Sequence, residues 1–437
     1  NPLTLKKQLQ AELYGMNEVI DRVVEELTAN LFSKDGYNCN CPILLAGPYG
    51  TGKTSIVKAI SRALACPFHQ ISMNGISDPD YLKGSSQTYS NGDSGVVIRN
   101  TYSSGSTRQV ILWDELDKVC NISNNAHSGN VLDSLCDLFG GGYFQDTFLG
   151  FPVDLRQTWN FATANDESKI PAVLLNRMEV IRLDDYTGKQ KRLIAREFIW
   201  PGLKREFSQE LDISAEAIDA VVDAHADTCG VRDVEKDLEN LMRYALTQKA
   251  SGTPLALIDK PLVEMRIKPA IRKTVNTIPH VGTATALAVS EFVGRTLELQ
   301  VDIQDGPEKL VITGLPQEDM MDSAKIALHL AAKHTGKSES CTVWLHLDEQ
   351  GIKKGGPSAG VPIFLAMWSA FADHPLSNEI CGTGEIDLWG NVKPVGDLPT
   401  KLLAAERAGC TIAFVPAACS HEVPELSSLK VVPIRNV

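Results

Sequence analysis

The stretch Gly47-Pro48-Tyr49-Gly50-Thr51-Gly52-Lys53-Thr54 matches the pattern G-x-x-x-x-G-K-[ST] at every fixed position. The apolar residues 41–46 before it predict a short buried strand, and residues 55–65 after it predict a helix with one apolar face. Glycines let backbone N–H groups turn inward, and a helix N-terminus adds partial positive charge, so this arrangement forms an anion site. The stretch therefore predicts a phosphate-binding loop; a chance glycine turn before a helix is the weaker alternative.

The residues of this loop have different expected roles. Lys53 would reach the β- and γ-phosphates of a nucleotide, and the Thr54 hydroxyl would hold Mg²⁺. The whole loop would contact the phosphates, which gives as expected cofactor-binding residues Gly47, Pro48, Tyr49, Gly50, Thr51, Gly52, Lys53 and Thr54.

A second apolar run, residues 109–113, ends in the two carboxylates Asp114 and Glu115. In P-loop enzymes the first acid at such a strand end helps to hold Mg²⁺. The second acid can polarise the water that attacks the phosphate. An ordinary strand followed by an acidic turn is the alternative, but the preceding phosphate-binding loop favours a nucleotide-hydrolysing pair.

Composition narrows the class of protein. A chain of 437 residues predicts about three domains. Its hydrophobic content of 43% and charged content of 22% are typical of soluble globular proteins. The apolar run at 361–372 is shorter than the roughly 20 residues that cross a bilayer, so we expect no membrane partner. The chain starts at Asn1 rather than Met, which leaves open a preceding segment.

Charge and cysteines exclude further classes. The net charge of −12 argues against general nucleic-acid binding, which requires a basic face. The 10 cysteines show no zinc-like spacing and no disulfide framework, so we expect reduced thiols and a cytoplasmic protein.

The order of predicted elements gives the fold class. Strands and helices alternate up to residue 183, which predicts a mainly parallel sheet covered by helices. Helical periodicity then dominates, with interruptions at Pro201-Gly202 and Gly230 and no strand before Val263. Residues 269–279 read as a linker. From Thr283 onward mixed strands and helices predict an α+β domain, so the expected domains are 1–186, 187–272 and 273–437.

The last domain contains a second pattern with chemical meaning. Residues 354–360 place Ser358 at a helix N-terminus after a glycine-rich turn, where backbone N–H groups can form an oxyanion hole. Lys401 is the candidate base. It lies in the first turn of a predicted helix at 398–407, where the helix dipole disfavours a cation and burial would lower its pKa.

A neutral lysine can take the serine proton, as in known Ser-Lys sites. His346 and His421 do not stand in a pattern that suggests a Ser-His-Asp triad. From spacing alone, a plain helix cap at Ser358 is the more common outcome.

Taken together, these motifs closely resemble those of the Lon ATP-dependent proteases across essentially the whole chain. Residues 47–54 resemble the family's Walker A motif and residues 112–118 (LWDELDK) its Walker B motif. The resemblance assigns Asn165, Arg177 and Arg232 to the remaining nucleotide motifs. Their segments are residues 161–165 for sensor 1, residues 171–179 for the arginine finger and residues 230–232 for sensor 2.

In the last domain residues 356–360 are similar to the nucleophile motif of the family. The segments 382–386 and 401–405 are similar to those with the supporting threonine and the catalytic lysine. The resemblance thus implies Ser358, Lys401 and Thr383 as peptidase residues. It also implies ATP with Mg²⁺ as cofactors, with Asp114 and Thr54 at the metal and Glu115 as a catalytic residue.

The family architecture implies a homo-oligomer, namely a hexameric AAA+ ring stacked on a ring of peptidase domains. ATP hydrolysis would thread unfolded protein through the pore, where Tyr89 takes the position of the gripping aromatic. Three departures stand out: little sequence precedes the ATPase, Gly355 replaces a frequent aspartate, and Ser90 follows the aromatic instead of an apolar residue.

Two other functions are compatible with parts of the pattern. An ATPase remodeller could use a Lon-type domain as a platform, but a platform does not require both Ser358 and Lys401. A peptidase with an inactive ATPase conflicts with the intact nucleotide residues Lys53, Asp114, Glu115, Asn165 and Arg177.

Overall fold

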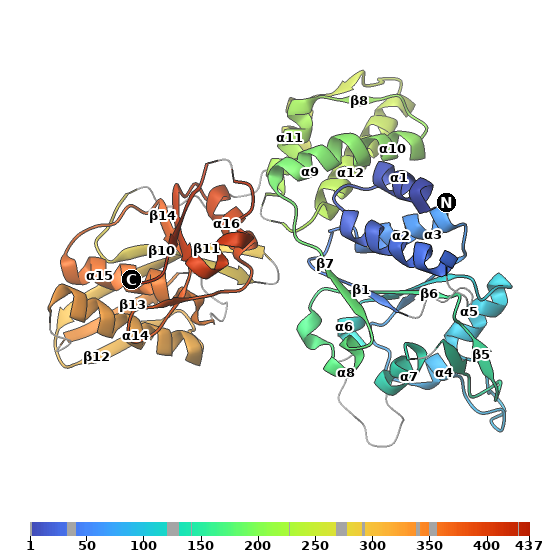
Figure 1. Cartoon of the computed structure of the whole chain (residues 1–437). Coiled ribbons are helices and arrows are strands. Elements are labelled where there is room, and N and C mark those ends of the chain that lie inside the picture. Colours follow the sequence, from blue (N-terminus) through green and yellow to red (C-terminus); the bar gives the residue numbers. More distant parts are fainter. Residues whose placement is uncertain are drawn as a thin grey trace. The chain divides into compact units, whose positions relative to one another are not determined.

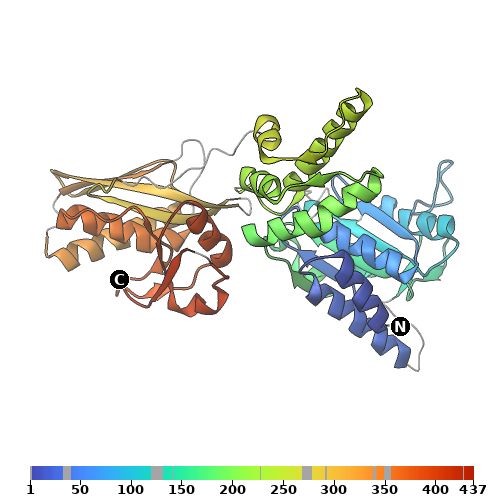
Figure 2. The ribbon, with the colours of Figure 1, turned by 90° about the horizontal axis from the view of Figure 1, so that it is seen from above.

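We describe a computed structural model of the chain, which covers residues 2–32, 41–119, 131–140, 142–226, 228–267, 278–290, 293–337, 341–348, 356–426 and 428–437. The chain divides into two compact units, Asn1–Val222 with Cys229–Ile267 and Lys268–Val437 with Asp223–Thr228 (Figures 1 and 2). The linker at 269–279 and the boundary at 272/273 expected from the sequence lie largely outside the described residues.

The first unit is built on a parallel five-stranded sheet with the strand order β2-β3-β6-β1-β7 (Figure 1). All neighbouring strands are parallel, so their carboxyl ends meet at one edge. This edge therefore receives Gly47, Asp114 and Asn165. The strands are β1 (Ile43–Ala46), β2 (Phe68–Ser72), β3 (Val110–Asp114), β6 (Trp159–Ala164) and β7 (Glu179–Arg182).

Helices cover both faces of this sheet because alternate strand residues point to opposite sides. Leu44 belongs to one core cluster, and Ile43 and Leu45 belong to the other. The second cluster is covered by α1 (Pro2–Glu12), α2 (Asn17–Phe32) and α3 (Lys53–Leu64). The first is covered by α4 (Asp80–Lys83), α5 (Val96–Ser104), α6 (Leu116–Val119), α7 (Val131–Leu138) and α8 (Ala172–Leu175), with the hairpin of β4 (Tyr143–Gln145) and β5 (Pro152–Asp154).

The helical part of this unit has its own core. Its elements are α9 (Gly188–Ile194), the π-helical turn η2 (Ala195–Ile199), α10 (Trp200–Glu206), α11 (Ala215–Ala224), α12 (Arg232–Ala250) and α13 (Lys260–Arg266). The expected interruption at Pro201-Gly202 is wrong. The helix runs on through Pro201, which lacks an N–H group, after widening into a π-turn directly before it.

The strand expected at Val263 is also wrong, because this residue is buried in α13. Asp259 caps that helix by accepting a hydrogen bond from the Leu262 N–H. The structure adds a pair of two-residue strands, β8 (Asp212–Ile213) and β9 (Leu257–Ile258), to this helical part.

The second unit contains a mixed seven-stranded sheet with the order β12-β13-β11-β10-β14-β17-β18. Helices α14 (Glu318–Thr335) and α15 (Gly360–Ala372) pack into one core cluster of this unit, and α16 (Leu398–Arg407) packs into another. The strands are β10 (Thr283–Ser290), β11 (Val293–Asp305), β12 (Lys309–Thr313), β13 (Cys341–Leu347), β14 (Ile380–Gly382), β17 (Ile412–Pro416) and β18 (Lys430–Ile434), with a small hairpin of β15 (Glu385–Ile386) and β16 (Val392–Lys393).

The mixed α+β character of this unit agrees with the expectation from the sequence. Across the described part of the chain, none of the helices combines enough length with enough apolar character to span a membrane.

Candidate functional site

The phosphate-binding loop joins β1 to α3, as expected, although α3 begins at Lys53 rather than at Ser55. Gly52 precedes the helix with a φ of 88°, a conformation that favours glycine. At Gly47 a Cβ atom would lie 2.2 Å from the Leu183 carbonyl oxygen. The close approach of β7 therefore requires a glycine at the start of the loop.

Lys53 is the central cation of the loop and is only 8% exposed. Its Nζ donates hydrogen bonds to the Gly47 oxygen at 2.6 Å, the Pro48 oxygen at 2.7 Å and Asn165 Oδ1 at 3.1 Å. Burial lowers the pKa of Lys53 to about 8, although nearby Asp114 and Asp117 act in the opposite direction. The structure thus brings Asn165 and the loop lysine together.

The two acids at the end of β3 contact one threonine of the neighbouring strand β6. Thr163 Oγ1 lies 2.5 Å from Asp114 Oδ1 and accepts the Glu115 N–H at 3.0 Å. Gln70 from β2 donates to Asp114 Oδ2 at 2.7 Å. Glu115 has a φ of 58°, a strained conformation that is common at functional sites.

The sequence analysis did not single out Thr163. A polar residue inside a buried strand is the available signal, because such a group must find a partner. Asp114 and Thr54 supply a carboxylate and a hydroxyl, which are oxygen ligands of the kind that Mg²⁺ takes from proteins beside phosphates. Within the described residues no group of three or more His, Cys, Asp or Glu forms a separate metal centre.

The start of α12 lies directly against the phosphate-binding loop. Val231 donates its N–H to the Gly50 oxygen at 3.0 Å. Gly230 has a φ of 65°, and a Cβ on it would lie 2.3 Å from the Gly50 carbonyl carbon. Arg232, the first residue of α12, is exposed beside this contact, so the structure places the expected sensor 2 residue at the loop.

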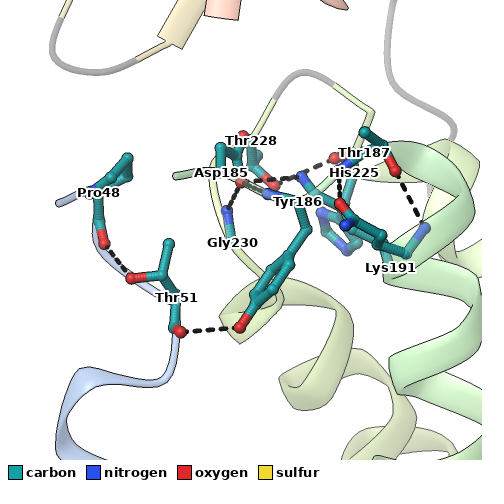
Figure 3. A network of polar contacts seen from close by, with 10 residues as sticks. Pro48, Thr51, Asp185, Tyr186, Thr187, Lys191, His225, Thr228 and Gly230 are labelled. Carbon is teal, nitrogen blue, oxygen red and sulfur yellow. Dashed lines mark hydrogen bonds and ion pairs between the residues drawn. The ribbon is translucent and has the colours of Figure 1, made fainter. Parts of the chain in front are cut away.

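A polar network that the sequence analysis missed supports the same junction (Figure 3). The Tyr186 hydroxyl donates to the Thr51 oxygen at 2.9 Å. Asp185 Oδ1 accepts the N–H groups of Tyr186 and Gly230, each at 2.7 Å, and lies 4.0 Å from the Lys191 Nζ. Burial, followed by the charge of Asp185, raises the pKa of Tyr186 to about 12, so its hydroxyl stays a donor.

Arg177 and Tyr89 lie away from these contacts. Arg177 is exposed just after α8 and donates to the Val173 oxygen at 2.9 Å. Among the described hydrogen bonds none joins Arg177 to residues 47–54 of the same chain. Tyr89 is 68% exposed in the loop between α4 and α5, so it is free to contact a partner molecule.

In the second unit Ser358 lies in the 3-10 turn η3 (Pro357–Ala359), directly before α15. Gly356 begins this turn with a φ of 97° and donates its N–H to Asp319 Oδ2 at 2.7 Å. The Ser358 oxygen accepts the Gly384 N–H at 2.7 Å and the Thr383 hydroxyl at 3.3 Å. The structure therefore brings the fully buried Thr383 to the serine backbone.

Lys401 is 5% exposed in α16. Burial lowers its pKa, although the charges of Asp397 and Cys419 oppose this. Ser358 and Lys401 come from elements that both contact β10. Among the described hydrogen bonds none joins the two side chains. His346 instead pairs with Thr313, at 2.7 Å between Nδ1 and Oγ1, on an exposed strand position.

Comparisons with known proteins match two parts of the chain to described families. Residues 43–186 match the family described as ATPase family associated with various cellular activities (AAA). Residues 259–435 match the family described as Lon protease (S16) C-terminal proteolytic domain.

Similar proteins include three bacterial relatives. The "Lon protease" of Desulfatibacillum aliphaticivorans is 32% identical, over 96% of this chain and 52% of its own length. The "Lon protease 1" of Thermus thermophilus is 33% identical, over 96% of this chain and 55% of its own length. The "Lon protease" of Clostridioides difficile is 31% identical, over the same two shares. The chain thus spans about half the length of these relatives. Through its AAA domain and its Lon-type proteolytic domain, the chain belongs to the Lon protease family.

Proposed function

We propose that this protein is an ATP-dependent serine endopeptidase that unfolds protein substrates, translocates them and cleaves them with a Ser-Lys dyad. The observation that carries this proposal is Lys401, which is 5% exposed and whose pKa is lowered by burial, in a Lon-type proteolytic domain. Among the described residues no ion pair includes Lys401, and a buried lysine without an ion-pair partner is costly. A serine nucleophile needs a base that takes its proton, and a lowered pKa favours the neutral amine that can act as this base.

In the first unit, ATP with Mg²⁺ supplies the phosphoryl-transfer step when bound. Lys53 and the backbone N–H groups of residues 47–54 would bind the phosphates. Asp114 and Thr54 would hold the metal ion, and Glu115 would orient the attacking water and accept its proton. Asn165 Oδ1 lies 3.1 Å from the Lys53 Nζ, so the Asn165 side chain would be a polar group of the same nucleotide site.

In the second unit, the Ser358 Oγ would attack the carbonyl carbon of the scissile peptide bond. Lys401 takes the hydroxyl proton and returns it to the leaving amine, which yields an acyl-enzyme and a free amino terminus. Backbone N–H groups at the start of α15 stabilise the oxyanion. Water, with its proton passed to Lys401, then releases the acyl group and restores the serine.

Three further parts of the proposal depend on assembly. Arg177, which is exposed and makes no described hydrogen bond to the loop of its own chain, would stabilise phosphoryl charge in a neighbouring subunit. This role requires a homo-oligomer, for which we propose a hexameric ring. Tyr89 would contact unfolded protein in the pore of this ring. The cytoplasmic location of the protein stays a prediction.

The proposal is tested by Ser358→Ala and Lys401→Ala. Each should abolish cleavage of peptides and of casein, while ATP hydrolysis continues at close to the parent rate. The double variant should be no worse than either single variant, because the two residues act as a unit. Loss of ATP hydrolysis in both variants would indicate damage to the fold, and retained cleavage in either would exclude the dyad.

A further inference from the structure

The hairpin of β4 and β5 carries a buried carboxylate that none of the proposed steps uses. Asp146 is 0% exposed. Its Oδ2 accepts the Gly95 N–H at 2.8 Å, and its Oδ1 accepts the N–H groups of Phe148 at 2.9 Å and Leu149 at 3.0 Å. The ion pairs within the described residues do not include Asp146. Burial of a carboxylate is costly unless hydrogen bonds compensate for the lost water. For Asp146 the three backbone N–H groups provide this compensation and fix the position of the side chain.

Gly95 closes the loop that carries Tyr89. At the base of this loop the Ser85 N–H donates to the Asp93 oxygen at 3.0 Å, and the Asp93 N–H donates to Ser85 Oγ at 3.1 Å. At the tip two further hydrogen bonds form a turn around Tyr89. The Tyr89 N–H donates to the Ser86 oxygen, and the Gly92 N–H donates to the Tyr89 oxygen. The base of the loop, which ends at Gly95, therefore meets the hairpin at Asp146.

Two more hydrogen bonds join the loop to the hairpin turn. Thr147 donates its N–H to the Lys83 oxygen at 2.6 Å. The Gln87 side-chain amide donates to the Phe148 oxygen at 2.5 Å. Contacts between α7 and both α4 and β4 hold the same region together (Figure 1).

Gly84 shows how tightly this contact is packed. It has a φ of 74°, and a Cβ on it would lie 2.8 Å from the Gly95 nitrogen and 3.0 Å from Asp146 Oδ2. The carboxylate thus lies against both ends of the loop.

The position of the hairpin in the chain connects it to the nucleotide site. We call the hydrogen bonds of Asp146 to the base of the Tyr89 loop the anchor. The hairpin lies between β3, which ends before Glu115, and β6, which ends before Asn165. Asn165 in turn contacts the phosphate-binding lysine. Because β5 leads into β6 through residues 155–158, we expect a shift of β6 that accompanies a change at the nucleotide to be passed to the hairpin.

We propose that Asp146 is a positioning residue that ties the Tyr89 loop to the hairpin, so that the loop follows the nucleotide site as one body. This inference rests on the proposed substrate contact by Tyr89. Without the anchor the loop would still carry Tyr89, but its motion would not be coupled to that of the hairpin. Protein substrates, which must be pulled, would be affected far more than short peptides, which diffuse to the peptidase site.

The test compares four variants of the chain. Asp146→Asn replaces one acceptor oxygen by a donor, and Gln87→Ala removes only the exposed amide that bonds to Phe148. Asp154→Asn is the matched control, because Asp154 is an exposed carboxylate of the same hairpin that pairs with Arg156. Tyr89→Ala tests the substrate contact itself.

The first measurement is the ratio of casein degradation to short-peptide cleavage. We expect this ratio to fall about tenfold in Asp146→Asn, to fall several-fold in Gln87→Ala and to be unchanged in Asp154→Asn. The second measurement is amide hydrogen exchange of residues 84–95, which should be about tenfold faster in Asp146→Asn than in the control.

The two readouts separate the two ideas. An unchanged ratio in Tyr89→Ala would refute the proposed substrate contact. The exchange rates of residues 84–95 would still show whether Asp146 holds the loop on the hairpin. A folded Asp146→Asn variant with the exchange and the ratio of the Asp154→Asn control would overturn the inference. If Asp146→Asn does not fold, Gln87→Ala decides: a fallen ratio supports the anchor, and an unchanged ratio overturns it.

Discussion

Two buried lysines, one in each unit, carry the proposed chemistry. Lys53 is surrounded by oxygens of Gly47, Pro48 and Asn165, which hold its ammonium group where phosphate is expected to bind. Lys401 is also buried, and the effect of burial on its pKa exceeds the opposing effects of Asp397 and Cys419. Burial lowers the pKa of both side chains, and their surroundings direct one to binding and the other to proton transfer.

The pH dependence of peptide cleavage should report Lys401. This side chain acts as a base only when neutral, and burial lowers its pKa below the ordinary value of 10.5. Cleavage should therefore rise as the pH rises through this lowered pKa, with its midpoint below 10.5.

Lys401→Arg should lower peptide cleavage by about 10³-fold or more at every pH, because a guanidinium keeps its proton. Initial rates with a fluorogenic peptide would measure both effects. Cleavage by Lys401→Arg at close to the parent rate would exclude Lys401 as the base.

Glu115→Gln should bind ATP and hydrolyse it about 10²–10⁴-fold more slowly. The reason is the proposed division of roles between the two acids, in which Asp114 would bind the metal ion and Glu115 would orient the water. Asp114→Asn is the comparison, and it should weaken Mg²⁺-dependent binding as well. Turnover of Glu115→Gln at the parent rate would show that another group activates the water.

The junction between the phosphate-binding loop and α12 depends on contacts between residues far apart in the sequence, which sequence patterns do not reveal. The strands around the loop were predictable because buried runs end in Gly47, Asp114 and Asn165. The contact of Tyr186 with Thr51 joins residues 135 positions apart, and nothing in the sequence relates them. The strands β8 and β9 were missed because two residues are too short to show an alternation.

The sequence around residues 259–261 contained signals of a helix start, but we predicted a strand there because Val263 is β-branched. Asp259 and Pro261 are typical residues of a helix start, and α13 begins at Lys260. Ser358 and Lys401 were candidates from their positions at two predicted helix starts, but only the family resemblance favoured the pair over a plain helix cap. Their spacing in sequence is compatible with many arrangements of α15 and α16.

Gly230→Ala tests the junction directly. The substitution puts a Cβ atom 2.3 Å from the Gly50 carbonyl carbon at a φ of 65°. We expect a loss of about 1–3 kcal/mol in the free energy of unfolding and weaker ATP binding. Gly252→Ala is a matched control, because Gly252 also has a positive φ of 81° but has open space around its Cβ position. Equal ATP affinity in the two variants would contradict a role of the junction in nucleotide binding.

Each of the two units contains one complete set of candidate residues. The nucleotide residues from Gly47 to Arg232 lie in the first unit, and Ser358, Thr383 and Lys401 lie in the second. A remodelling ATPase with a structural platform would need the first set alone. The buried Lys401 and the Thr383 contact with the serine backbone favour a peptidase, because a structural platform requires neither.

The most direct test of this combined activity is casein degradation by the chain with ATP, with ADP and without nucleotide. We predict degradation with ATP, little or none in the other two conditions, and none with ATP in Ser358→Ala or Lys53→Ala. Short peptides should be cleaved by Lys53→Ala but not by Ser358→Ala. Casein degradation that proceeds equally without nucleotide, or that survives Ser358→Ala, would contradict an ATP-dependent serine peptidase.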